Sequence, residues 1–174
     1  MATKKSMRLL FSILAISAWV LGSAIQAGAE TLNYKFYTWV TKGDDVPVGD
    51  AEGHIVGYAV RGAFWVFENG EVATINHVAT RDLIKGSGPF MQYVTVNFAD
   101  GSTIIIKSHG TLGGTAAGAL ATGGWTSEII KGTGRFTGIK GTATSKVKYL
   151  PLQKGEAGQK GYGEGTITYT LPPK

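Results

Sequence analysis

The chain has 174 residues, with 17 Lys or Arg, 12 Asp or Glu and no cysteine. The lack of cysteine excludes a disulfide framework, a cysteine nucleophile and cysteine-ligated zinc. The formal net charge of +5 is modest, and the lysines of the C-terminal third are spread along the sequence rather than gathered into the basic face that nucleic-acid binding needs. We therefore predict no nucleic-acid partner.

The first 29 residues have the layout of a secretory signal peptide. A basic stretch at 4–8 precedes an apolar run at 9–25, and the small residues Ala27-Gly28-Ala29 follow. This order is typical of a cleaved export signal, with Glu30 as the first mature residue. An uncleaved membrane anchor is the alternative, and the apolar run is near the lower length limit for a span.

Cleavage after residue 29 would leave 145 residues, with 14 basic and 12 acidic side chains and a net charge of +2. That length suits one domain with its own core. We predict two parts, a signal peptide at 1–29 and a single β-barrel domain at 30–174. The mature protein is expected to be secreted or periplasmic, with no membrane span after cleavage.

Strand signals dominate the mature chain, and no stretch of it predicts a helix. Aromatic and β-branched residues concentrate in eight runs separated by turn residues. Asn69-Gly70 and Asp100-Gly101 predict hairpins in which both turn residues take a positive φ. The expected strands are 32–41, 54–67, 72–83, 90–98, 102–108, 125–130, 136–149 and 161–171.

Eight consecutive strands joined largely by hairpins favour an all-β fold, an eight-stranded antiparallel β-barrel. The interior of such a barrel either fills with side chains or holds one small ligand. An outer-membrane barrel is the rival architecture, but neither face of the 72–83 strand is apolar throughout, as a lipid-facing band requires.

The segment 131–146 is unusually rich in glycine, with Phe136 and Ile139 set among the glycines. No helix follows it, so it is not a phosphate-binding loop. We interpret it as a curved barrel strand in which Gly134 and Gly138 relieve crowding while Phe136 and Ile139 pack.

Two runs, Asp100-Gly101-Ser102-Thr103 and the segment from Ile129 through Gly-Thr-Gly-Arg-Phe-Thr-Gly to Gly141, resemble the allene oxide cyclase-like barrel superfamily. That superfamily also contains the plant dirigent proteins. The resemblance covers roughly the C-terminal half of the chain. It implies an eight-stranded antiparallel barrel with a largely apolar cavity, often oligomeric, that holds and steers a reactive hydrophobic small molecule.

The resemblance carries no active-site residue onto this chain. The cyclases use a glutamate near the first strand, and 32–41 holds no carboxylate. Dirigent proteins use aspartates and an arginine around their pocket, and Arg81 and Asp82 are available here without a match to the family positions.

Glu71, His77 and Arg81 are the candidate catalytic residues, because the two-residue period of a strand places them on one face. If that face lines the lumen, a histidine and an arginine lie in a mostly apolar interior and are functional candidates. If it points outward, all three are solvated. Alternation alone leaves both readings open.

The remaining polar candidates favour solvated positions. Lys107 and His109 lie opposite an apolar face, and Glu164 lies opposite three glycines. The three histidines, His54, His77 and His109, are on three different strands without ligand spacing. We therefore predict no metal and no cofactor.

Aromatic side chains in the strands are the candidate ligand contacts, since ligand pockets are mainly apolar and aromatic. The predicted binding residues are Tyr37, Trp39, Tyr58, Trp65 and Tyr93.

The leading functional hypothesis is an exported barrel that binds a small hydrophobic molecule in its lumen. A lumen isomerase or cyclase is the alternative. A third is an interaction protein that forms a homo-oligomer through apolar outer faces.

Overall fold

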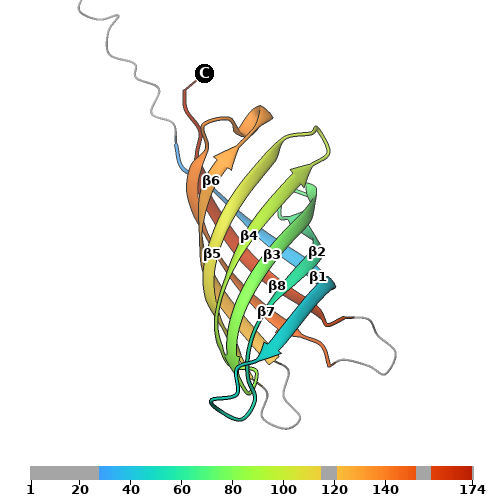
Figure 1. The fold of residues 1–174 in the computed structure, drawn as a ribbon. Coiled ribbons are helices and arrows are strands. Elements are labelled where there is room, and N and C mark those ends of the chain that lie inside the picture. The colour runs from blue at the N-terminus through green and yellow to red at the C-terminus, as the bar shows by residue number, and fades with distance from the viewer. Residues whose placement is uncertain (1–27, 115–120, 152–157, 174) are drawn as a thin grey trace, which may run out of the picture. The chain divides into compact units, whose positions relative to one another are not determined.

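Eight strands form a closed antiparallel barrel in the computed structural model, which describes residues 28–114, 121–151 and 158–173 (Figure 1). The prediction of an all-β, eight-stranded antiparallel barrel is confirmed. The strands are β1 (Glu30–Pro47), β2 (His54–Phe67), β3 (Val72–Ile84), β4 (Gly88–Phe98), β5 (Thr103–Gly113), β6 (Ala121–Gly132), β7 (Lys140–Tyr149) and β8 (Lys160–Thr170).

The predicted signal peptide falls almost wholly on residues 1–27, which lie outside the described residues. Residues 29–172 form the barrel unit. Within the described part of the chain, no helix is long and apolar enough to cross a membrane.

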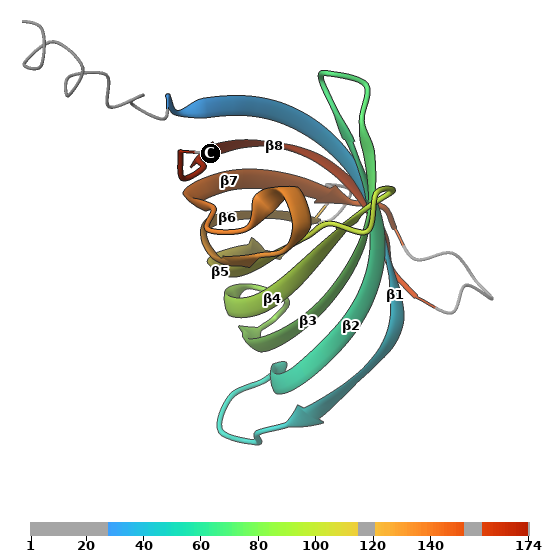
Figure 2. The ribbon, with the colours of Figure 1, turned by 90° about the horizontal axis from the view of Figure 1, so that it is seen from above.

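Every strand pairs with its sequence neighbours, and β1 closes the barrel against β8 with Tyr34 opposite Gly165. The view from above shows the strands following one another around the barrel (Figure 2). Closure satisfies the backbone of both terminal strands, which would otherwise be unpaired edges.

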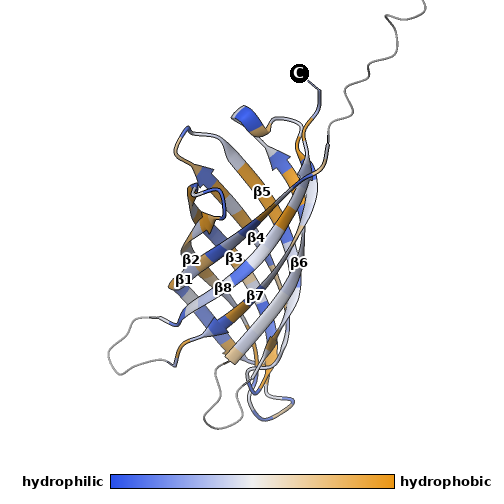
Figure 3. Ribbon diagram, turned by 180° about the vertical axis from the view of Figure 1, so that it is seen from behind, coloured by the Kyte–Doolittle hydropathy of each residue, from blue (hydrophilic) through white to orange (hydrophobic). Residues whose placement is uncertain are grey.

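Alternation along each strand separates a lumen face from an outer face. On β5, Ile104, Ile106 and Ser108 are buried, whereas Lys107 and His109 lie on the other face, as the sequence predicted. The isoleucines make this part of β5 markedly hydrophobic (Figure 3). Three glycines of β8, at 161, 163 and 165, lie on the lumen face, where Cβ atoms would collide with aromatic rings such as that of Tyr34.

The two short hairpin turns differ from the prediction. Gly70 and Gly101 take a positive φ, of 85° and 81°, but Asn69 and Asp100 do not. The Phe67 carbonyl accepts from Gly70 N–H at 2.9 Å, and the Phe67 N–H donates to the Glu71 carbonyl at 2.9 Å. This is a type I turn completed by a glycine bulge, which needs only one left-handed residue.

The glycine-rich segment is not a continuous strand, so that prediction is wrong. The 3₁₀ turn η1 (Gly134–Phe136) interrupts it, and β7 starts only at Lys140. Gly134 and Gly138 take positive φ values of 59° and 79°, which an L side chain rarely adopts. The expected packing is confirmed, because Phe136 and Ile139 are both buried.

Candidate functional site

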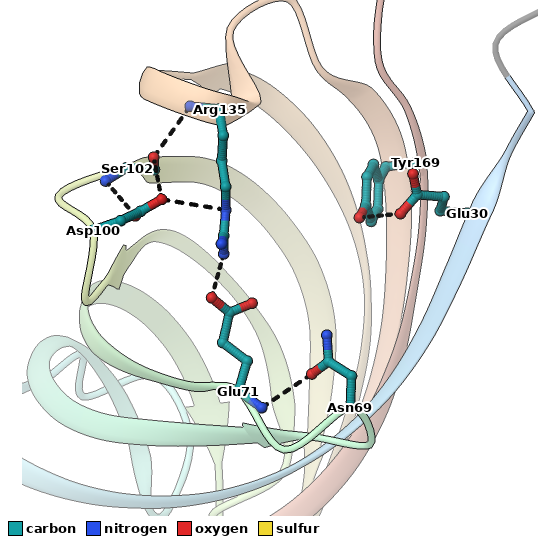
Figure 4. Close-up of polar contacts among 7 residues, drawn as sticks. All are labelled: Glu30, Asn69, Glu71, Asp100, Ser102, Arg135 and Tyr169. Atoms are coloured by element: carbon teal, nitrogen blue, oxygen red, sulfur yellow. Dashed lines mark hydrogen bonds and ion pairs between the residues drawn. The ribbon is translucent and has the colours of Figure 1, made fainter.

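The 3₁₀ turn η1 lies at one end of the barrel, where the Arg135 side chain reaches from it toward Glu71 (Figure 4). Phe136 packs against Phe98, with ring centroids 4.7 Å apart, and edge-on against Tyr169 at 6.3 Å. The Arg135 guanidinium covers the rings of Phe98 and Phe136 at 4.8 and 4.7 Å. We call this arrangement the η1 plug.

Polar contacts hold the η1 plug to neighbouring strands (Figure 4). Arg135 pairs with Glu71, the residue before β3, and its Nε lies 3.6 Å from an Asp100 carboxylate oxygen. The Arg135 backbone N–H donates to Ser102 Oγ at 3.1 Å, and Ser102 Oγ in turn donates to Asp100 at 3.1 Å.

Replacing Arg135 by alanine is expected to loosen the η1 plug and lower the free energy of unfolding by about 1–2 kcal/mol, from two exposed cation–π contacts and an ion-pair network. Hydrogen exchange of the Ile139 N–H, which donates to the Phe136 carbonyl at 3.0 Å, should quicken. Lys131→Ala removes a nearby exposed cation and is the control. Equal exchange in both variants would refute the role of Arg135.

Next to the η1 plug, the lumen is filled by packed aromatic rings. Tyr34 stacks on Trp65 with centroids 4.0 Å apart and planes 8° from parallel. The Tyr34 hydroxyl lies 2.7 Å from Ser145 Oγ, and burial raises the pKa of Tyr34 to about 12. Tyr34 and Trp65 are both part of the buried hydrophobic cluster of the barrel.

Beyond the aromatic layer, β1 to β4 contribute four polar side chains to the lumen: Thr38, Arg61, His77 and Gln92. His77 Nδ1 lies 2.9 Å from Gln92 Oε1, and His77 Nε2 lies 3.4 Å from Thr38 Oγ1. Arg61 Nε donates to Thr38 Oγ1 at 3.1 Å, and Arg61 Nη2 donates to the Gln159 carbonyl at 3.1 Å. We call these four residues the lumen polar cluster.

The lumen polar cluster holds an uncharged histidine beside a buried cation. Burial, opposed by the Gln92 hydrogen bond and helped by nearby Arg61, lowers the pKa of His77 to about 4. Burial also lowers the pKa of Arg61 from its usual value, although an arginine stays protonated at neutral pH. A neutral imidazole next to a guanidinium can accept a proton while the guanidinium stabilises negative charge.

Toward the end opposite η1, inward side chains keep some accessible surface. His77, Arg81, Trp125 and Tyr149 are all intermediate in exposure, whereas the aromatic layer next to the η1 plug is buried. Arg81 forms two hydrogen bonds of 2.8 Å to the Asp45 carboxylate. We call this the accessible end of the lumen.

Two of the three candidate catalytic residues, His77 and Arg81, share the inward face of β3, whereas Glu71 directly precedes this strand, and the three do not form one site. His77 belongs to the lumen polar cluster and Arg81 lies nearer the accessible end, paired with Asp45. Glu71 pairs with Arg135 in the η1 plug. It is six residues from His77 along the chain, about 20 Å at 3.3 Å per residue, so Glu71 cannot act with His77.

Of the five predicted ligand contacts, only Trp65 lies in the lumen, where it is 7% exposed. Tyr37, Trp39 and Tyr93 are 56%, 40% and 45% exposed. They and Tyr58 alternate with lumen residues, so the strand period puts them on the outer face and their expected place in the lumen is wrong. The predicted homo-oligomer stays a prediction.

Sequence reasoning missed Thr38, Arg61 and Gln92. Arg61 stands among Val60, Gly62 and Ala63 in an otherwise apolar stretch, and a lone charge in such a strand is a signal that could have marked it. Thr38 and Gln92 alternate in phase with buried aromatic residues of their strands, a weaker signal that needs the facing of the strand to be known.

The other polar candidates lie apart from the cluster. His54 is held between Asp50 and Asp82, which raise its pKa, and His109 and Glu164 are exposed. Within the described ranges, no group of three or more His, Asp or Glu side chains is placed to hold a metal ion.

A groove of about 970 Å³ crosses β2, β1, β8, β7, β6 and β5 at one level. Two rows of outward side chains border it, for example Lys35 and Glu164 in one row and Asn33 and Thr166 in the other. The outward side chains along it are mostly polar, Val66 excepted, and none of them is Phe, Tyr or Trp.

Comparison with one solved structure supports the dirigent-like fold. The pterocarpan synthase dirigent protein PsPTS1 matches with a TM-score of 0.50 and 18% identity, over 86% of this chain and 99% of that one. The pterocarpan synthase dirigent protein GePTS1 matches with a TM-score of 0.47 and 14% identity, over 87% and 94% of the two chains. No protein-family model matches the sequence, and no curated protein does.

Proposed function

Because the chain has the dirigent-like barrel fold, we propose that it binds a small, largely apolar molecule in its lumen, entering from the accessible end. The observation that carries this proposal is the accessible surface kept by two large inward aromatic side chains. Inward aromatic residues are buried at the η1 plug, whereas Trp125 and Tyr149 keep accessible surface toward the other end. An apolar wall with a few placed polar groups is the usual composition of a ligand site.

Trp125 is the main apolar wall of this proposed site. Its ring contacts Phe36 and Phe90, each at a centroid distance of 5.8 Å. Phe36 and Phe90 are the inward neighbours of Thr38 and Gln92 on their strands. The apolar wall therefore adjoins the lumen polar cluster, and one molecule could contact both.

The neutral dye 1-aminoanthracene tests the proposal by its fluorescence when titrated with the protein. We expect saturable binding that Ala79→Phe weakens at least tenfold, because Ala79 lies on the inward face of β3 near the accessible end. Thr80→Phe adds the same ring on the outer face and is the matched control. No binding by the unsubstituted protein, or equal effects of both variants, would reject the proposal.

Export belongs to the same proposal and rests on the layout of residues 1–29. Intact mass measurement of the protein recovered from its producing cells should give the 145-residue chain that begins at Glu30. A full-length mass in the cytosol would reject export without touching the lumen proposal.

A lumen isomerase or cyclase is a second candidate, favoured by one observation. His77 faces the lumen as an uncharged base, and Arg61 and His77 both approach Thr38 Oγ1, at 3.1 and 3.4 Å. His77 could remove a proton while Arg61 stabilises the resulting oxyanion. A solved protein of this fold is itself named a synthase. If a bound ligand is isomerised, His77→Gln should abolish turnover and keep binding, and unchanged turnover would reject this role.

A further inference from the structure

Among the described residues, the buried guanidinium of Arg61 in the lumen has no carboxylate hydrogen-bonded to it. Arg61 is 6% exposed, and its hydrogen bonds in the described part of the chain go to a hydroxyl and a carbonyl. Its guanidinium also lies over the Tyr149 ring at 5.1 Å. These partners satisfy donors but supply no negative charge, and a buried cation left unneutralised is costly.

The other ionisable side chains described near Arg61 do not cancel this charge. Arg81 is a second cation, already paired through both of its 2.8 Å hydrogen bonds with Asp45. His77 hydrogen bonds to neutral Gln92 and Thr38. Among the described residues, no hydrogen bond occupies Arg61 Nη1, and no buried side-chain nitrogen or oxygen lacks a partner. Nη1 is therefore a donor of Arg61 that no described residue occupies.

From this arrangement we infer that Arg61 binds the carboxylate of a compact aromatic acid in the lumen. The inference rests on the proposed lumen binding and adds the chemical class of the ligand. The guanidinium favours a planar anion, and the ligand ring would contact Trp125 and Tyr149. The stacked Tyr34–Trp65 layer fills the lumen toward the η1 plug, so a compact body fits this site better than a long chain.

Isothermal titration calorimetry of the mature protein with trans-cinnamate and with cinnamamide tests the inference. The two probes share ring and length and differ in charge. We expect cinnamate to bind at least tenfold more tightly, as a charge-assisted contact to a buried guanidinium implies. In Arg61→Gln the preference for cinnamate over cinnamamide should vanish. Arg61→Lys should keep part of this preference, because lysine has the positive charge but lacks the paired N–H donors of a guanidinium. Lys107→Gln, which removes an outer-face cation, should keep it fully.

The comparison of the two probes on the unsubstituted protein needs no variant to fold. Equal affinities, a preference for cinnamamide, or no binding of either probe would overturn the inference. Titration with neutral 1-aminoanthracene separates the two levels of the argument. If the dye binds and cinnamate has no advantage, lumen binding stands and the anionic ligand is rejected. If neither dye nor cinnamate binds, the proposed function fails as well.

Discussion

Replacing Gly165 by valine is expected to lower the free energy of unfolding by about 3 kcal/mol or more, the upper range for overpacking a filled core. A Cβ at Gly165 would lie 2.5 Å from the Tyr34 ring and 2.6 Å from the Thr144 carbonyl oxygen. The Tyr34 ring has little freedom to move away, because it stacks on Trp65 at 4.0 Å and its hydroxyl lies 2.7 Å from Ser145 Oγ. Urea unfolding followed by tryptophan fluorescence measures the loss.

Gly124→Val is the matched control for this substitution. Gly124 also lies in a strand of the barrel, but the nearest atom to a Cβ there is the Ser145 carbonyl oxygen at 3.8 Å, an ordinary contact. We expect this variant to unfold within about 0.5 kcal/mol of the original protein, as surface substitutions usually do. If the two valine variants lose the same free energy of unfolding, the close approach of Tyr34 does not explain why position 165 is glycine.

The number and pairing of the strands could be predicted because both depend on local pattern. The run from His54 to Phe67 is rich in β-branched and aromatic residues, and its predicted bounds agree with those of β2. Asn69-Gly70 and Asp100-Gly101 mark turns whatever their detailed type. When consecutive strands pair as hairpins, only the first and last strands keep an unpaired edge, and pairing β1 with β8 closes both edges.

The η1 turn could not be predicted from the same pattern, because its conformation depends on distant contacts. Gly132 allows the chain to fold back, since a Cβ there would lie 2.1 Å from the Phe136 carbonyl oxygen. The segment is held by Glu71, Asp100 and Ser102, which are more than thirty residues earlier in the chain. Glycine spacing alone fits a curved strand as well as a turn.

The facing of β3 decided how much of the site could be predicted. Both faces of this strand mix apolar and polar residues, so the sequence could not tell whether His77 and Arg81 point inward. Arg61 was harder to assign, because a buried arginine contradicts the usual preference of charged residues for the surface. The barrel resolves both points, since closure fixes one inward face for every strand.

Acidification from pH 7 to pH 4 is expected to destabilise the fold through His77, by about 3 kcal/mol. Burial lowers the pKa of His77 from 6.5 to about 4, and each pH unit between those values is worth about 1.4 kcal/mol. In that window the unfolded chain binds a proton at His77 that the folded chain does not bind. The free energy of unfolding therefore falls as the pH drops below 6.5, and the destabilisation due to His77 reaches its full size below about pH 4.

Urea unfolding of the original protein and of His77→Gln between pH 7.5 and pH 4 isolates this contribution, because other groups titrate in the same range. His54 acts in the opposite sense, since Asp82 and Asp50 raise its pKa and favour the folded state at lower pH. The loss of stability on acidification should be about 3 kcal/mol smaller in His77→Gln. His109→Gln removes an exposed histidine from the outer face and should follow the original protein. If the free energy of unfolding falls equally with pH in His77→Gln and in the original protein, His77 is protonated as readily in the folded chain as in the unfolded chain. The assignment of His77 as a neutral base next to Arg61 would then be rejected.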